Sequence, residues 1–137
     1  MALSVNVLAP AFLLLLVQGN PFCLQGARPD KCTPASVDVL QTSNGAKAGV
    51  DPVFEVMVQN WCDCAVWGVI LSSEGFSSSL PVDPKLFRKE GNGYLVGDGS
   101  LIQSGAVVQF QYAWDRAFEI RPLSVQEDCS GLHESTM

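Results

Sequence analysis

The sequence predicts an all-β fold: a single-domain, two-sheet β-sandwich of about seven short strands, held by disulfides and preceded by a signal peptide. Three observations support this prediction. Short runs rich in β-branched residues recur between turn residues, helical periodicity is hard to find after residue 26, and the chain contains 5 cysteines. A chain of 137 residues has room for one hydrophobic core.

The N-terminal segment is typical of a secretory signal peptide. Residues 5–17 carry no charge and are dense in Leu, Val, Ala and Phe, as in the apolar region of such a signal. This run is shorter than the roughly 20 apolar residues that a membrane-spanning helix needs. We therefore expect export without membrane insertion, with residues 1–26 as the signal peptide and cleavage between positions 19 and 27.

Two segments in which polar and apolar residues alternate predict the first strands. These segments are residues 36–41 and 53–60, and Asn44–Gly45 together with Lys47-Ala48-Gly49 predicts a turn-rich connection between them. One face of the second segment carries Phe54, Val56 and Val58, so we expect this face to point to the core.

The middle of the chain predicts a buried strand followed by a loop. Residues 66–71 are apolar apart from Gly68, which is typical of a strand buried on both faces. Trp67 lies within this run, so we expect its ring to pack in the core. Two prolines disfavour a helix over residues 81–84, which are therefore expected to form an edge or a loop.

Three further strands are predicted in the C-terminal half. Residues 94–96 lie between glycine-rich turns, residues 106–114 alternate clearly, and residues 117–125 alternate again. Residues 130–137 are predicted to form a disordered tail. We expect the β-sandwich domain to span residues 27–129.

The cysteines of an exported chain indicate a disulfide framework. Cleavage after Gly26 would remove Cys23 and leave an even number. The remaining four allow three pairings, of which a direct bond within the central Cys-Asp-Cys would close a strained ring. Each outer cysteine is therefore expected to pair with one member of the central pair, and which member stays open; the four are Cys32, Cys62, Cys64 and Cys129.

The charge balance argues against a nucleic-acid-binding protein. The formal net charge is −6, and the basic cluster is limited to Lys85, Arg88 and Lys89, whereas proteins that follow phosphates need many clustered cations. A zinc site is not expected either, because the cysteines lack a second short pair and the single histidine, His133, lies in the polar tail. We expect no cofactor.

Groups suited to catalysis are few. A Ser-His-Asp arrangement would depend on His133. Carboxylate pairs such as Glu55 with Asp98, or Asp115 with Glu119, could in principle cleave a glycosidic bond. We interpret them instead as surface acids that keep the domain soluble. The sequence therefore predicts a protein that is not an enzyme, with no catalytic residues.

Two tryptophans near strand ends, Trp61 and Trp114, are candidates for contact with a partner. Each lies beside polar residues, so each is read either as an exposed platform or as a side chain packed in the domain, against a disulfide in the case of Trp61. An exposed strip of Trp61, Trp114 and Tyr94 would suit a cell-wall polysaccharide.

Several segments, taken in order, carry a family resemblance. They are Phe-Glu-Val-Met-Val-Gln-Asn-Trp-Cys at 54–62, Gly-Val-Ile-Leu-Ser at 68–72 with Phe-Ser-Ser at 76–78, Asp-Pro-Lys-Leu-Phe-Arg at 83–88, Leu-Val-Gly-Asp-Gly at 95–99, and Gly105 leading into Phe-Gln-Tyr-Ala at 110–113. With their flanking cysteines they resemble the plant tapetum determinant family. Its members are small secreted cysteine-rich ligands of a leucine-rich-repeat receptor kinase that controls anther cell fate. The resemblance covers residues 32–129.

This sequence departs from the family pattern at its cysteines. Relatives usually carry six in the mature domain, and the resemblance places the two absent ones at Ser73 and Tyr94. It implies that these positions are paired in relatives and lie close together here. The central pair is compressed to Cys62-Asp63-Cys64, and together these changes mark a divergent member.

Two functions follow as hypotheses. By resemblance, the chain is a secreted signalling ligand of the apoplast that binds the ectodomain of a leucine-rich-repeat receptor-like kinase and specifies cell fate in anther or reproductive development. Lys85, Arg88 and Lys89 are the expected contact, because they form the one basic cluster of an acidic chain. The alternative is a secreted glycan-binding β-sandwich module without catalysis.

Overall fold

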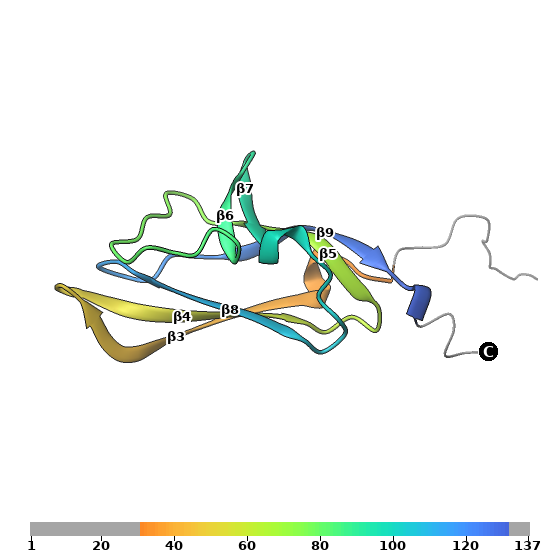
Figure 1. Cartoon of the computed structure of the whole chain (residues 1–137), viewed down its shortest axis with the longest axis horizontal. Coiled ribbons are helices and arrows are strands. Elements are labelled where there is room, and N and C mark those ends of the chain that lie inside the picture. The colour runs from red at the N-terminus through yellow and green to blue at the C-terminus, as the bar shows by residue number, and fades with distance from the viewer. Residues whose placement is uncertain (1–30, 132–137) are drawn as a thin grey trace, which may run out of the picture. The chain divides into compact units, whose positions relative to one another are not determined.

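The computed structural model describes residues 31–131, which form two antiparallel β-sheets packed face to face (Figure 1). One sheet has the strand order β3-β4-β8 and the other β6-β7-β5-β9. The strands are β3 (Val37–Ala48), β4 (Asp51–Asn60), β5 (Ala65–Ser72), β6 (Phe87–Glu90), β7 (Gly93–Val96), β8 (Val107–Ala113) and β9 (Arg121–Asp128). The predicted all-β sandwich of about seven strands is confirmed.

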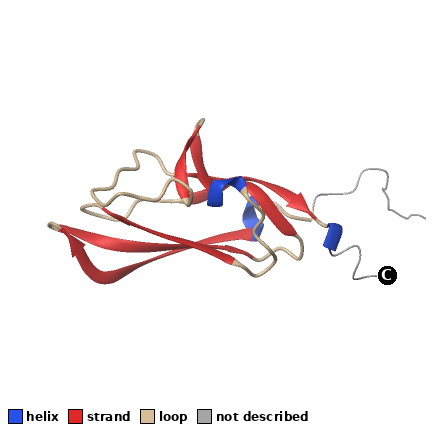
Figure 2. Cartoon of the chain, in the orientation of Figure 1, coloured by secondary structure: helices blue, strands red, loops and turns tan. Residues whose placement is uncertain are grey.

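Helix contributes little to the described residues (Figure 2). Of the two short 3-10 turns, η1 (Pro34–Ser36) precedes β3 and η2 (Gly97–Gly99) lies between β7 and β8. Within residues 31–131, no helix is both long and apolar enough to cross a membrane. The predicted signal peptide, Cys23 and residues 132–137 of the predicted tail lie outside the described residues.

The long hairpin of β3 and β4 differs from its prediction at the connection. Gly49 of the predicted connection does lie in the turn between the two strands, whereas Asn44–Gly45 forms an irregularity inside β3, where the pairing register shifts between Ser43 and Lys47. The Asn44 side chain accepts a hydrogen bond from Ala46 N–H at 2.8 Å, and Gly45 has a φ of 84°. This local turn absorbs extra residues without ending the strand.

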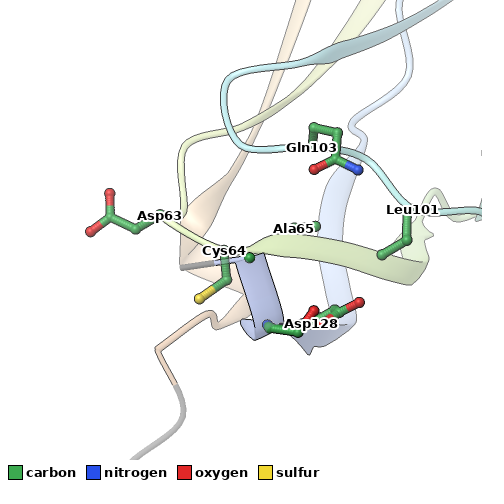
Figure 3. A pocket seen from close by; sticks show the side chains of 8 residues that line it. Asp63, Cys64, Ala65, Leu101, Gln103 and Asp128 are labelled. Carbon is green, nitrogen blue, oxygen red and sulfur yellow. Dashed lines mark hydrogen bonds between the residues drawn. The ribbon is translucent and has the colours of Figure 1, made fainter. Parts of the chain in front are cut away.

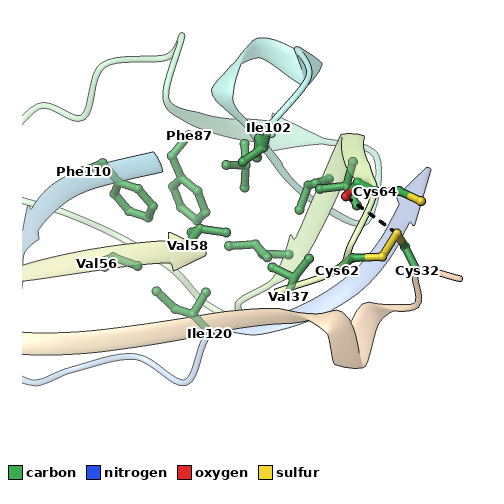
Figure 4. Packing of buried hydrophobic residues seen from close by; sticks show 14 of the residues in the cluster. Cys32, Val37, Val56, Val58, Cys62, Cys64, Phe87, Ile102, Phe110 and Ile120 are labelled. Carbon is green, nitrogen blue, oxygen red and sulfur yellow. Dashed lines mark hydrogen bonds between the residues drawn. A yellow bond between two sulfur atoms is a disulfide. The ribbon is translucent and has the colours of Figure 1, made fainter. Parts of the chain in front are cut away.

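The core lies between the two sheets (Figure 4). Val56 and Val58 of β4 are fully buried, which confirms the predicted core face, and Phe54 of that face is half-buried. Stacked rings join the sheets: the centroids of Phe87 from β6 and Phe110 from β8 are 4.3 Å apart. Such aromatic contacts stabilise the core beyond the stabilisation that comes from burying the apolar area of the rings.

The prediction that β5 is buried on both faces was wrong, and with it the core position of Trp67. Trp67 is 44% exposed, whereas Val66 and Val69 are fully buried. The cause is a bulge: Gly68 has a φ of 57°, and the register with β9 shifts between Trp67 and Ile70. The extra residue lets two valines three positions apart face inward, and it leaves Trp67 on the outer face.

The last strand begins later than predicted. β9 starts at Arg121, and the preceding residues form a loop whose Ile120 is buried in the core. Phe118 of this loop donates its N–H to the Tyr112 hydroxyl at 2.9 Å. The loop is therefore fixed by a side chain of β8 instead of by a strand ladder.

Candidate functional site

The end of the sandwich at the β4–β5 connection carries both disulfides, and Figure 4 shows the Cys32–Cys62 bond with Cys64 beside it. The bonds are Cys32–Cys62 and Cys64–Cys129, one of the two pairings that the sequence leaves open. They tie the residues before η1 and after β9 to the central Cys-Asp-Cys turn. The sulfurs of Cys32, Cys62 and Cys64 lie close enough together to hold one metal ion, but sulfur atoms in disulfides are not thiolate ligands.

A buried asparagine organises this turn. Asn60, the last residue of β4, donates its side-chain amide to the carbonyls of Cys64 and Ile102, both at 2.9 Å. Its side-chain oxygen accepts the N–H of Cys62 at 2.8 Å. These hydrogen bonds satisfy the buried carbonyl of Cys64 and N–H of Cys62, and they add to the β-bridge bond that the Ile102 carbonyl accepts from the Val66 N–H. Asn60 therefore holds both cysteines of the turn in position for their partners.

The predicted basic cluster is divided by the geometry of β6. Arg88 lies opposite Leu95 and Lys89 opposite Tyr94 on β7, so the two side chains point to opposite faces of the hairpin. Lys85 lies in the preceding turn, where its N–H binds the Asp83 carboxylate at 2.9 Å.

The three cations also differ in their partners. Arg88 forms an ion pair with Asp98 at 2.6 Å and binds the carbonyl of Pro84 at 3.2 Å. The Lys89 ammonium lies 5.5 Å from the centre of the Tyr94 ring, within the range of a cation–π contact. Arg88 is thus committed to an internal partner, and the exposed Lys85 and Lys89 are left to present positive charge.

The two candidate tryptophans lie far apart. Trp61 follows the end of β4 and is 63% exposed, beside Lys31 and Asp63 in a shallow recess of about 330 Å³. Trp114 follows β8, half-buried, with its ring centroid 6.3 Å from that of Phe118. Because β4 and β8 are antiparallel, these positions lie at opposite ends of one sheet, about 30 Å apart.

Tyr94, the third ring of the strip expected for a glycan, lies in the other sheet. It is half-buried and stacks on Phe87 with centroids 4.7 Å apart. Trp61, Trp114 and Tyr94 therefore do not form one flat strip. Of these three rings, Trp61 is the exposed one, and it lies at the disulfide end.

Comparison with known proteins gives a family. The model of the family described as "Tapetum determinant 1, C-terminal" matches residues 33–129. The chain belongs to the tapetum determinant family. It is also 32% identical over 109 residues to TPD1 protein homolog 1B of Oryza sativa subsp. japonica, over 78% of this chain and 63% of the relative. The chain thus spans less than two thirds of that relative's length, and no solved structure matches it significantly.

The tapetum determinant match covers both sheets and three of the four disulfide cysteines, and it begins directly after Cys32. The resemblance places two further cysteines of the family at Ser73 and Tyr94, and Tyr94 lies opposite Leu71, two residues before Ser73. Ser73 is 5% exposed, and its hydroxyl has no hydrogen-bond partner among the described residues.

An open pocket of about 490 Å³ lies beside the Cys64–Cys129 bond (Figure 3). Its lining includes the carboxylates of Asp63 and Asp128 and the side chains of Leu101 and Gln103. Hydrogen bonds from the backbone and side chain of Ser130 lower the pKa of Asp128, so this carboxylate is ionised at neutral pH. The pocket is a mixed polar and apolar surface recess with acidic groups at its rim.

The carboxylates considered for catalysis are engaged in surface contacts. Glu55, on the outer face of the three-stranded sheet, accepts hydrogen bonds from the side chains of Asn44, Gln109 and Gln111. Asp98 is paired with Arg88 in the other sheet. The remaining two, Asp115 and Glu119, each lie beside an arginine, Arg116 and Arg121 respectively.

Sequence reasoning missed two structural side chains, Asn60 and Tyr112. The Tyr112 hydroxyl donates to the Gln41 side chain at 2.6 Å while it accepts the N–H of Phe118. A polar residue at the end of an apolar strand was the available signal for Asn60. No comparable signal marked Tyr112, because its partners are 71 and 6 residues away in the chain.

Proposed function

We propose that this chain is a secreted extracellular ligand that binds the ectodomain of a leucine-rich-repeat receptor-like kinase, in the manner of the tapetum determinant family. The observation that carries the proposal is the family match across residues 33–129, which includes the complete sandwich as far as Cys129. Cell-fate signalling in anther or reproductive tissue is the corresponding biological role.

The two disulfides support the extracellular part of the proposal. Disulfides persist in oxidising compartments and are rare where thiols are kept reduced. They join segments 30 and 65 residues apart in the chain, and they fix the end of the domain that exposes Trp61. A surface held in one conformation loses less conformational entropy when a receptor binds it.

We infer that Lys85 and Lys89 supply part of the receptor contact. Both are exposed, whereas Arg88 is paired with Asp98. On a chain with a net charge of −6, Lys89 in β6 and Lys85 in the turn before it are two cations without an ion-pair partner among residues 31–131, and they define a local positive surface. Such a surface steers an acidic partner and affects mainly the association rate.

Direct binding tests the receptor proposal. The oxidised chain, produced through a secretory pathway, is titrated against a panel of leucine-rich-repeat ectodomains, with reduced and alkylated protein as the control. Submicromolar binding by the oxidised form alone is expected. The proposal fails if no ectodomain of the panel binds.

A charge-reversal pair tests the contact. We expect Lys85→Glu/Lys89→Glu to weaken binding to the cognate ectodomain by about tenfold, through slower association at low salt. The matched control is Lys31→Glu/Lys47→Glu, which changes the net charge equally at two exposed lysines elsewhere. Equal effects of both pairs would show that only net charge matters.

A further inference from the structure

Strand β8 has an edge that lacks the usual protection. It is the terminal strand of the three-stranded sheet and pairs only with β4. Its sequence, Val-Val-Gln-Phe-Gln-Tyr-Ala, contains no charge, no proline and no glycine. Natural edge strands are usually protected by lysine, proline or a bulge, because their unpaired backbone groups otherwise accept another strand.

The direction of the backbone groups along β8 follows from two hydrogen bonds. The carbonyl of Ala106 accepts the N–H of Asn60 at the end of β4, so residues with even numbers face β4. The carbonyl of Ala113 instead accepts the N–H of Ser79, on the side away from β4. The backbone N–H and C=O groups of the odd-numbered residues Val107, Gln109 and Gln111 therefore point to the open edge.

A groove runs along this edge. It has a volume of about 500 Å³, and Gln109, Phe110 and Gln111 line it on the β8 side. The opposite wall comes from the loop before β6. Its lining residues are Leu80, Pro81, Asp83 and Leu86.

The loop itself shows how a chain fits beside β8. Ser79 N–H binds the Ala113 carbonyl at 2.8 Å, and the Ser78 hydroxyl accepts the Ala113 N–H at 3.0 Å. After Ser79 the chain leaves the edge at Leu80–Pro81. Within residues 31–131, no such backbone bond continues to Gln111 or Gln109.

We propose that this groove binds an extended segment of a partner polypeptide, which adds a strand beside β8 from residue 111 to residue 107. The backbone groups of the odd-numbered residues supply the hydrogen bonds, as in other cases of strand addition. Alternate side chains of the bound segment pack against Leu80 and Leu86. A lysine or arginine of the segment faces Asp83, the one charged side chain that lines the groove among the described residues.

The structure favours such a segment over a second copy of this chain. An antiparallel β8–β8 pair centred on Gln109 would place Gly105 of the second copy opposite Ala113. Ser79 already occupies that position through its bond to the Ala113 carbonyl. Two domains that each carry a net charge of −6 would also repel each other. A short basic segment meets neither obstacle.

A proline substitution tests the open edge of β8 without disturbing the fold. In Gln109→Pro the lost N–H is one that points away from β4, so the ladder that holds β8 in the sheet is retained. The matched control Gln109→Thr removes the same side chain and keeps the N–H. Disulfide content and the thermal unfolding midpoint of both variants show whether each is folded.

The probe is a phage-displayed library of random dodecapeptides, selected on the oxidised full chain. We expect the enriched peptides to carry alternating aliphatic residues and a lysine or arginine, without proline in that stretch. A synthetic copy of the best peptide should bind Gln109→Pro at least about tenfold more weakly than it binds Gln109→Thr, since one backbone hydrogen bond is lost and the ring obstructs the edge.

Hydrogen exchange locates the bound peptide. Saturating peptide should slow exchange of the amides of Gln109 and Gln111 and leave the amides of β3 unchanged. Equal binding to both variants, no enrichment from the library, or concentration-dependent dimers that compete with the peptide would each overturn the proposal. The test uses no receptor, so its failure is independent of the receptor proposal.

Discussion

The two ends of the sandwich are closed by different interactions. At one end, the Cys32–Cys62 and Cys64–Cys129 bonds surround the buried side chain of Asn60. At the other, the Tyr112 hydroxyl joins β3 to the loop before β9 through Gln41 and Phe118. In the chain-entropy account, disulfides act mainly by restricting the unfolded chain. The hydrogen bonds act on the folded state, so the two ends should respond differently to mutation and to pH.

The largest effect is expected from removing the longer disulfide. Cys64→Ala/Cys129→Ala opens a loop with a sequence separation of 65 residues, whereas Cys32→Ala/Cys62→Ala opens one of 30. Loop-closure entropy predicts a loss of about 4 kcal/mol for the first pair and about 0.7 kcal/mol less for the second. Urea unfolding of the oxidised proteins measures both. A larger loss for the shorter loop would show that local packing around Cys32 and Cys62 dominates.

Asn60→Ala should have the next largest effect. The change leaves the carbonyl of Cys64 and the N–H of Cys62 without their partner in a buried site, and the carbonyl of Ile102 keeps only its bond from the Val66 N–H. We expect a loss of about 3 kcal/mol in the free energy of unfolding. Gln59→Ala is the control, since its side chain donates to the Gly105 carbonyl at an exposed position. Similar losses in both variants would contradict a special role for the buried amide.

Tyr112→Phe tests the other end, with an expected loss of about 1–2 kcal/mol at neutral pH from the two hydrogen bonds. Burial raises the pKa of the Tyr112 phenol, and the hydrogen bond from Phe118 opposes this in part. A raised folded-state pKa gives stability that is present below the unfolded value of about 10 and is lost as pH rises through the folded value.

The difference between wild type and Tyr112→Phe should therefore shrink above about pH 10. Urea midpoints from pH 7 to pH 11 measure it, with Tyr94→Phe as the control at the other tyrosine. A difference that stays constant over this range would show that the phenol ionises equally in the folded and unfolded chains.

Local patterns in the sequence predicted the sandwich. They gave the wrong buried face where a bulge residue interrupts the alternation of inward and outward side chains along a strand. Alternation identified Val56 and Val58 as core residues because β4 is regular on that face. In β5, the same reasoning misplaced Trp67. A glycine at position 68 is visible in the sequence, but its positive φ and the resulting bulge depend on the register with β9.

The candidate contact residues show a similar limit. Lys85, Arg88 and Lys89 are close in sequence, which predicted one cluster. Strand geometry sends Arg88 and Lys89 to opposite faces, and the partner of Arg88, Asp98, comes from the next turn. Spacing along the chain could not give either fact, because both depend on how β6 pairs with β7.

The smallest effect should be a gain in stability at Ser73. Its hydroxyl is buried without a hydrogen-bond partner among the described residues, and a buried polar group in that state costs free energy. We expect Ser73→Ala to raise the free energy of unfolding by about 0.5–1 kcal/mol, while Ser72→Ala, at a half-buried neighbour, changes it little. Urea unfolding measures both variants. A loss of stability in Ser73→Ala would contradict this prediction. It would mean that a water molecule satisfies the hydrogen-bonding capacity of the hydroxyl.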